Sequence, residues 1–239
     1  ILVHGGMETG RSWDAVMPLL ASHYRVIRPD SRGHGRTDNP AGRLSYALMA
    51  DDVLAFMRAL ELDRPFVCGW SDGGQVALEL AIRDRDAARA VIANGVLANF
   101  SEQYLRVVRG YLFVDEDLQV DVARFAAEHP RAVERLREKH SHVYGDDYWR
   151  AYLQQIAALW LTPTGLTAER LQQITTPMLI SIGDRDEFVL LDEALVMYRQ
   201  IPHGELAVAP GATHSFPETK PELFAATILE FLGRHSGGA

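Results

Sequence analysis

The segment VCGWSDGG (67–74) lies between a short apolar run and the helical pattern QVALELAIRD (75–84). Glycine commonly marks a turn, and serine commonly caps the start of a helix. The spacing Gly-x-Ser-x-Gly between a strand and a helix is also typical of a nucleophile elbow, a tight turn that holds a serine hydroxyl above the end of a sheet. Ser71 is predicted to be a nucleophile only if a base, a carboxylate and an oxyanion-binding loop occur where such a fold needs them.

The chain has 239 residues, of which 47% are hydrophobic, and this is typical of one large α/β domain with a substantial core. The formal net charge of −8 argues against nucleic acid or an anionic membrane as the main partner. The sequence has no secretory signal and no apolar run long enough to span a bilayer. We therefore expect a small-molecule substrate, no nucleic acid or membrane partner and a cytoplasmic location, whereas the oligomeric state is left open.

The sequence begins ILVHGG, in the middle of a strand pattern and without an initiator methionine. We therefore expect one or two further strands to precede Ile1 in the natural protein. The single cysteine, Cys68, lies in a predicted buried strand, where it is expected to fill the core rather than to react.

Strand and helix patterns alternate along most of the chain and predict a mainly parallel sheet covered on both faces. Between 99 and 172 only helical patterns occur, which predicts a helical cap over the carboxyl ends of the strands, where such sheets bind ligands. The expected division is a core of 1–98 and 173–239 with a cap (lid) of 99–172. Strands are expected at 1–3, 24–30, 65–70, 89–97, 176–184 and 204–210, and core helices at 13–20, 45–60, 74–84, 192–200 and 221–235.

The predicted base is His214, in the loop PGATHSF that follows the strand 204–210. In a fold with a nucleophile elbow the chain order is serine, then acid, then histidine, and His214 is downstream of Ser71 as required. His4 and His34 belong to upstream loops. The remaining histidines are expected to be solvated side chains of helices or loops: His23, His129, His140, His142, His203 and His235.

The predicted acid lies in GDRDEFV (183–189), directly after the strand 176–184. A carboxylate at a strand end can reach the histidine loop of the next strand. Spacing alone does not separate Asp186 from Asp184. Asp184 and Glu187 can equally be interpreted as solvent-exposed carboxylates of the turn.

The oxyanion formed during acyl transfer needs two N–H donors near the hydroxyl. The N–H of Asp72, at the start of the predicted helix, is one. The loop HGGMETG (4–10) leaves the first strand and supplies the other, which we assign to Gly6, with Met7 as second choice. Loss of one such donor typically costs about 10²–10³ in turnover.

Five motifs in this order, HGG, RPDSRGHGRTD, GWSDGG, GDRDEFV and GATHSF, resemble the α/β-hydrolase superfamily of serine hydrolases over nearly the whole chain. The resemblance implies the α/β-hydrolase fold and hydrolysis without a cofactor. It also implies that Asp186 is the triad acid, because the family's G-x-x-D-x-x-V element matches Gly183 to Val189. Dehalogenases and epoxide hydrolases of this superfamily carry an aspartate nucleophile, so Ser71 disfavours those activities.

GWSDGG, ANGVLANFSE (93–102) and VYGDDYWRAYLQQI (143–156) are also similar to valacyclovir hydrolase and other biphenyl-hydrolase-like esterases. This similarity implies that Asp72 is a counter-ion for a substrate amine. The alternative is that Asp72 only stabilises the helix dipole, by roughly 0.3–1 kcal/mol.

Three further features are predicted to be structural. SRGHGRT (31–37) lacks the lysine pattern of a phosphate-binding loop, so it is expected to be a loop beside the site. The clusters His140/His142/Asp146/Asp147 and Asp115/Glu116/Asp117 lack the spacing of metal ligands and are expected to be solvated cap surface, so no metal is predicted. Most aromatic side chains of the cap should form its core, whereas Trp70 and Met7 are expected to contact substrate.

The sequence therefore predicts a serine hydrolase that cleaves small carboxylic esters, possibly of amino acids, through an acyl-enzyme intermediate. Three other activities would use the same residues: hydrolysis of a C–C bond, hydrolysis of a lactone, and perhydrolysis of the cofactor-free haloperoxidase type. A ligand-binding receptor without catalysis would have no need of all three groups.

Overall fold

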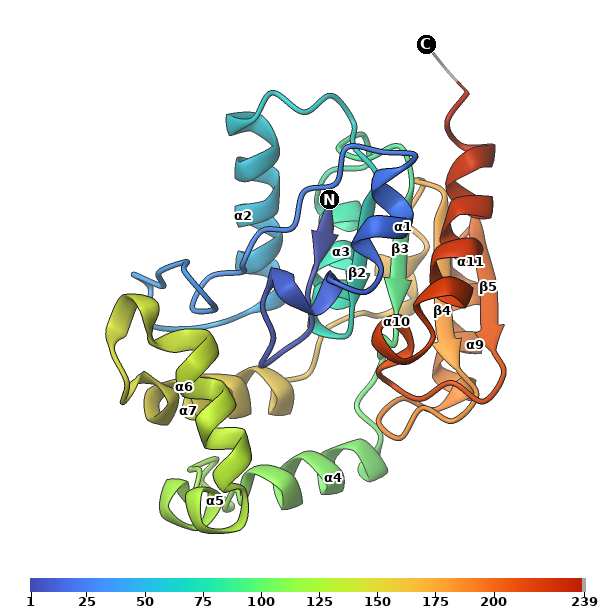
Figure 1. The fold of residues 1–239 in the computed structure, drawn as a ribbon. Helices are drawn as coiled ribbons and strands as arrows, with labels where there is room; N and C mark the ends of the chain where they lie inside the picture. The colour runs from blue at the N-terminus through green and yellow to red at the C-terminus, as the bar shows by residue number, and fades with distance from the viewer. Residues whose placement is uncertain (238–239) are drawn as a thin grey trace.

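A five-stranded parallel sheet forms the centre of the protein, in a computed structural model that describes residues 1–237 (Figure 1). The strands lie side by side in chain order and run in the same direction. Their bounds are β1 Leu2–Val3, β2 Val67–Trp70, β3 Val91–Asn94, β4 Met178–Gly183 and β5 Gly204–Ala209. The predicted parallel sheet is confirmed.

Helices cover both faces of this sheet, as predicted (Figure 1). On one face lie α1 (Met17–Ala21) and α11 (Pro221–Arg234), with α10 (Phe216–Thr219) and a 3₁₀ turn at Gly10–Trp13. On the other face lie α2 (Tyr46–Ala59), α3 (Asp72–Arg83) and α9 (Leu191–Gln200).

The two layers of the core follow from the pleat of the strands, because successive side chains of a strand point to opposite faces. In β3, Val91 and Ala93 pack with α2 and α3, whereas Ile92 packs with α11. Cys68 of β2 is buried in the α11 layer, as predicted, and burial raises its pKa to about 12, so the thiol is protonated at neutral pH.

Helices α4 to α7, which follow β3, lie below the ends toward which the strands point (Figure 1), whereas the short α8 contacts α9 before β4 begins. Helices α6 and α7 pack against each other, and α7 also packs against α4. Their helical character is as expected for 99–172, and the division into a core and a cap domain stays a prediction. Their bounds are α4 Glu102–Leu112, α5 Val122–Glu128, α6 Pro130–Tyr144, α7 Tyr148–Leu161 and α8 Ala168–Leu171.

The prediction of a strand over 24–30 was wrong. This segment lies beside β1, but it shares only one backbone hydrogen bond with it, from the N–H of Leu2 to the carbonyl of Ile27 at 2.8 Å. A ladder needs repeated pairing, and β1 is only two residues long. The helix expected at 13–20 is also divided, into the 3₁₀ turn and α1.

Helix α2 begins and ends close to the predicted limits. The hydroxyl of Ser45 accepts a hydrogen bond from the N–H of Leu48, as expected for a cap residue. Met49, Val53 and Met57 are buried, but Leu60 is exposed because it lies beyond the last turn. No helix within residues 1–237 combines the length and apolar character needed to cross a membrane.

Candidate active site

Ser71 occupies a sharp turn between β2 and α3, with φ 55° and ψ −118°. A positive φ is strained for a residue with a side chain, and such strain often marks a functional position. The turn is possible because its neighbours are glycines. A Cβ on Gly69 would overlap the carbonyl of Gly73, and a Cβ on Gly73 would overlap the carbonyl of Val3. The Gly-x-Ser-x-Gly pattern is therefore a packing requirement here.

The structure brings Ser71, His214 and Asp186 together. The Nε2 atom of His214 lies 3.0 Å from Oγ of Ser71, and its Nδ1 atom lies 2.9 Å from Oδ2 of Asp186. A carboxylate can only accept a hydrogen bond, so Nδ1 carries the proton and Nε2 accepts the hydroxyl proton of Ser71. The side chains come from the ends of β2, β4 and β5.

Backbone groups hold Asp186 in place. Its Oδ1 atom accepts hydrogen bonds from the N–H groups of Phe188 and Val189, each at 2.9 Å. Asp184 points elsewhere and accepts from the N–H of Gly211. Glu187 is exposed, as expected. Its carboxylate accepts a hydrogen bond from the N–H of His214 at 3.1 Å, and this bond holds the backbone of the loop that carries His214.

The two predicted oxyanion donors, the N–H groups of Gly6 and Asp72, donate no hydrogen bond to any atom within residues 1–237. The N–H of Met7, in contrast, donates to the hydroxyl of Tyr152 at 2.9 Å. This bond leaves Gly6 as the better donor in the loop after β1. Met7 still lines the cavity described below.

The carboxylate of Asp72 is buried, with 4% of the residue exposed. It accepts a hydrogen bond from the hydroxyl of Tyr46 at 2.8 Å and another from Nε1 of Trp160 at 2.9 Å. Burial raises the pKa of Asp72, and these two hydrogen bonds oppose that shift. Both partners are neutral, and Asp72 forms no ion pair with any Lys, Arg or His in the described part of the chain.

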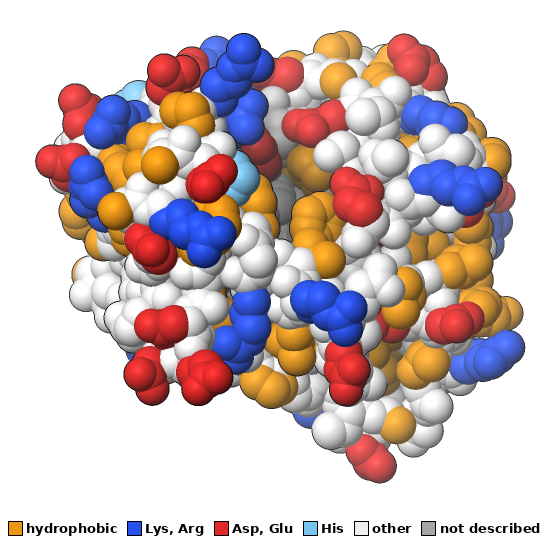
Figure 2. Space-filling view, turned by 90° about the horizontal axis from the view of Figure 1, so that it is seen from below, with side chains coloured by type: hydrophobic (Ala, Val, Ile, Leu, Met, Phe, Trp, Pro, Cys, Tyr) orange, Lys and Arg blue, Asp and Glu red, His pale blue; other side chains and the backbone are white. Residues whose placement is uncertain are grey.

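A cavity of about 320 Å³ adjoins Ser71 and His214. Its volume is in the range of small-molecule sites. Trp70 and Met7, the two residues predicted to contact substrate, line it, and Nε1 of Trp70 also donates to the carbonyl of His214 at 2.8 Å. The molecule is hollowed on the face seen from below in Figure 2, where basic and acidic side chains are mixed rather than gathered by sign. The rest of the cavity wall is mostly apolar and aromatic: Tyr46, Leu97, Tyr104, Val108, Tyr111, Trp160, Phe188 and Val189.

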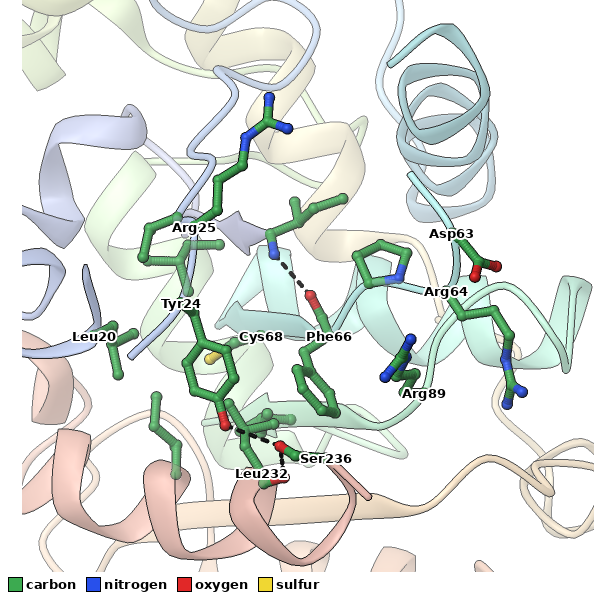
Figure 3. Close-up of a pocket in the computed structure, with 16 residues that line it drawn as sticks. Leu20, Tyr24, Arg25, Asp63, Arg64, Phe66, Cys68, Arg89, Leu232 and Ser236 are labelled. Carbon is green, nitrogen blue, oxygen red and sulfur yellow. Dashed lines mark hydrogen bonds between the residues drawn. The ribbon is translucent and has the colours of Figure 1, made fainter. Parts of the chain in front are cut away.

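A second cavity, of about 390 Å³, lies at the opposite ends of the strands (Figure 3). Its wall includes Tyr24, Phe66, Cys68 and Leu232, and the hydroxyl of Tyr24 lies 3.1 Å from Oγ of Ser236. None of the predicted site residues lines it, and the protonated thiol of Cys68 has little nucleophilic character.

The expectation that His140 is a solvated cap residue was wrong, because only 2% of it is exposed. Its Nδ1 atom accepts a hydrogen bond from the N–H of Gly35 at 3.0 Å, and its ring stacks on Tyr152. His34 and His4, from the two core loops, lie beside it and are buried as well. Helix periodicity did not reveal this burial, since the covering groups come from distant loops.

No group of three or more His, Cys, Asp or Glu side chains within residues 1–237 is arranged to hold a metal ion. The loop 31–37 contains no helix and packs against α6 and α7 through Gly35 and His34. It also pairs with α2, because Arg32 donates to both carboxylate oxygens of Asp52.

Several residues of the site were not recognised in the sequence as site residues. Tyr46 and Trp160 bind Asp72, Tyr152 binds the loop of Gly6, and Gln75 lines the cavity. Gln75 could have been found, because it lies one helical turn after Ser71. The others come from elements far away in the chain, and no local pattern identifies them.

The profile of the Alpha/beta hydrolase family matches residues 1–227 of the chain. The "Putative carbamate hydrolase RutD" of Caulobacter sp. (strain K31) is 29% identical, over 97% of this chain and 89% of that protein. The "Pimeloyl-[acyl-carrier protein] methyl ester esterase" of Yersinia enterocolitica is 27% identical, over 97% of this chain and 92% of that protein. The solved structure of a thermophilic esterase from Thermogutta terrifontis has a TM-score of 0.74 and 26% identity, over 98% of this chain and 89% of that chain.

Proposed function

The chain belongs to the alpha/beta hydrolase family, and we propose that it is a serine hydrolase that cleaves small carboxylic esters. The observation that carries the proposal is the continuous hydrogen-bonded series from the hydroxyl of Ser71 through His214 to Asp186. The names of its relatives support hydrolysis but differ in the bond cleaved, a carbamate in one and a methyl ester in another. The similarity to biphenyl-hydrolase-like esterases stays a prediction.

In the proposed reaction His214 removes the proton of Ser71 as its oxygen attacks the ester carbonyl. The negative charge on the carbonyl oxygen is stabilised by the N–H groups of Gly6 and Asp72. Asp186 stabilises the imidazolium that forms, and Nε2 then protonates the departing alcohol. Water, deprotonated by His214, attacks the acyl-enzyme and releases the acid and the free hydroxyl of Ser71.

Replacement of the nucleophile tests this proposal. Ser71→Ala should lower kcat on p-nitrophenyl butyrate by about 10⁴-fold or more, since no other group forms the acyl-enzyme. The wild-type protein should be labelled by a fluorophosphonate probe at Ser71, and the variant should not. Ser22→Ala, which changes an exposed serine, is the matched control.

Undiminished turnover in a pure Ser71→Ala sample would refute the assignment of the nucleophile. An unlabelled wild-type protein would favour the receptor without catalysis. A panel of esters, enol-lactones and vinylogous diketones separates ester hydrolysis from lactone and C–C bond hydrolysis, which the same side chains could perform.

A second candidate is hydrolysis of amino-acid esters. It is favoured by the burial of Asp72 in the cavity wall with neutral partners only. A buried carboxylate without a cation is unfavourable, and a substrate ammonium group would supply the missing charge.

We predict that a valine ester is cleaved faster than its des-amino analogue, and that Asp72→Asn removes this preference. A hydrogen bond to a charged group is worth about 1.5–3 kcal/mol, which corresponds to a change of about 10- to 100-fold in the ratio of kcat/KM. Asp146→Asn, on the exposed cap surface, is the control. If the wild-type protein does not prefer the amino ester, or if Asp72→Asn keeps that preference, the role of Asp72 is limited to stabilising the N-terminus of helix α3.

A further inference from the structure

The side chain of Gln75 has a buried hydrogen-bond acceptor without a partner in the described part of the chain. Gln75 is only 3% exposed, and its Nε2 group donates to the carbonyl of Leu97 at 2.7 Å. Its Oε1 atom makes no hydrogen bond to residues 1–237. Buried acceptors are normally paired, so an unpaired one on a residue that lines a cavity indicates that a ligand or water completes it.

The orientation of this amide is determined by its neighbour. The carbonyl of Leu97 can only accept, so the atom of Gln75 that faces it must belong to the NH₂ group. The acceptor Oε1 is therefore the free end of the amide. Gln75 lines the same cavity as Ser71 and His214.

The position of Gln75 in helix α3 brings it close to the bond that would be cleaved. Its N–H donates to the carbonyl of Ser71 at 3.0 Å. Residues four apart at the start of a helix share one face, with Cβ atoms about 5–6 Å apart. The surrounding wall includes the apolar side chains of Leu97 and Val108.

We propose that Gln75 is a specificity-determining residue whose Oε1 atom accepts a hydrogen bond from a hydroxyl or protonated amine of the ester substrate. This inference rests on the hydrolase function proposed above. A purely alkyl ester would leave Oε1 unpaired or displace its water without replacing the hydrogen bond, so a donor-bearing ester is favoured. Asp72 can recognise charge, whereas Gln75 recognises a donor whether or not it is charged.

The test compares matched esters within one enzyme. In the first set of esters the hydrogen-bond donor is on the acid part: phenyl 3-hydroxybutyrate and phenyl 3-aminobutyrate are compared with phenyl butyrate. A second pair carries it on the alcohol, as 2-hydroxyethyl butyrate against propyl butyrate. In at least one comparison the wild-type protein should favour the donor-bearing ester by about tenfold in kcat/KM, as one neutral hydrogen bond allows.

Gln75→Leu should bring that ratio close to one, whereas Gln103→Leu, on the exposed surface of α4, should keep the wild-type ratio. A purely structural role of Gln75 at Leu97 would lower both rates of a pair together and leave the ratio unchanged. Comparison of phenyl 3-hydroxybutyrate with phenyl 3-aminobutyrate distinguishes a neutral donor from a charged one. Gln75→Met, which keeps an unbranched side chain, replaces Gln75→Leu if the latter does not fold.

A wild-type protein that hydrolyses these esters without any donor preference would overturn the role of Gln75 alone. A donor preference that remains in Gln75→Leu would also overturn this role. In that case the hydrogen-bond partner of Oε1 would be water rather than the substrate. Failure to hydrolyse any ester would overturn the proposed ester hydrolysis and, with it, this inference.

Discussion

Steric limits at single residues explain why certain positions in the loops around Ser71 require glycine. Gly6 faces Asp72 and Trp160 so closely that a Cβ would overlap the carboxylate and lie 2.6 Å from Cζ2 of the indole ring. The same crowding holds the backbone of Gly6 against the side chain of Asp72, the residue that follows the nucleophile. The assignment of Gly6 as an oxyanion donor stays a prediction, and glycine suits a close backbone approach to a ligand.

Gly6→Ala is therefore expected to displace the loop after β1 and the N–H donor that it carries. The predicted effect is a fall in kcat of about 10²-fold on p-nitrophenyl butyrate, as for loss of one oxyanion donor. Gly110→Ala is the matched control, because a Cβ there meets nothing within 4 Å and position 110 lies in helix α4. Steady-state kinetics measures the effect, and a nearly unchanged kcat for Gly6→Ala would exclude this loop as an oxyanion donor.

At the scale of helices and strands, the sequence predicted most elements because their patterns are local. The helical pattern of segments such as 45–60 and the alternation of strands and helices depend on neighbours a few residues apart. The segment 24–30 has the composition of a strand, yet it makes one hydrogen bond to β1 and no ladder. Strand formation depends on a partner, and composition does not contain that information.

The helices between β3 and β4 show the same limit. Their helical periodicity is evident, but the burial of His140 on α6 depends on loops more than 100 residues earlier in the chain. His140 receives a hydrogen bond from Gly35 and packs against His34. A contact of this kind ties α6 to the core, and no pattern within α6 distinguishes His140 from the exposed His142.

At the scale of the whole molecule, the buried histidines make stability depend on pH. Burial lowers the pKa values of His4 and His34, and it lowers that of His140 to about 4 from its ordinary value of 6.5. In the unfolded chain these side chains bind a proton below about pH 6.5. The folded state is therefore at full stability above that pH and loses stability as the pH falls toward 4.

For His140, a pKa of about 4 gives an expected loss of about 3 kcal/mol in the free energy of unfolding between pH 7 and pH 4. His140→Asn keeps an acceptor for Gly35 but cannot be protonated, so its stability should fall less over that range than the wild type. Urea denaturation at pH 7 and pH 4.5 measures the difference, with the exposed His142→Asn as control. An equal loss in wild type and His140→Asn would show that His140 does not contribute to acid lability.

The sequence by itself determined the family, most of the strands and helices and their order, the strained turn at Ser71 and the residue types offered for each role. These features follow from short motifs and local periodicity, and both can be recognised in the amino-acid sequence without knowledge of tertiary contacts. Only the tertiary structure decided which groups meet. It placed Asp186, the carboxylate that the family resemblance implies, against His214, paired Asp72 with Tyr46 and Trp160, and left Oε1 of Gln75 without a partner among residues 1–237. Ser71 and His214 are 143 positions apart, and their 3.0 Å separation results from the packing of neighbouring strand ends, which no local pattern specifies.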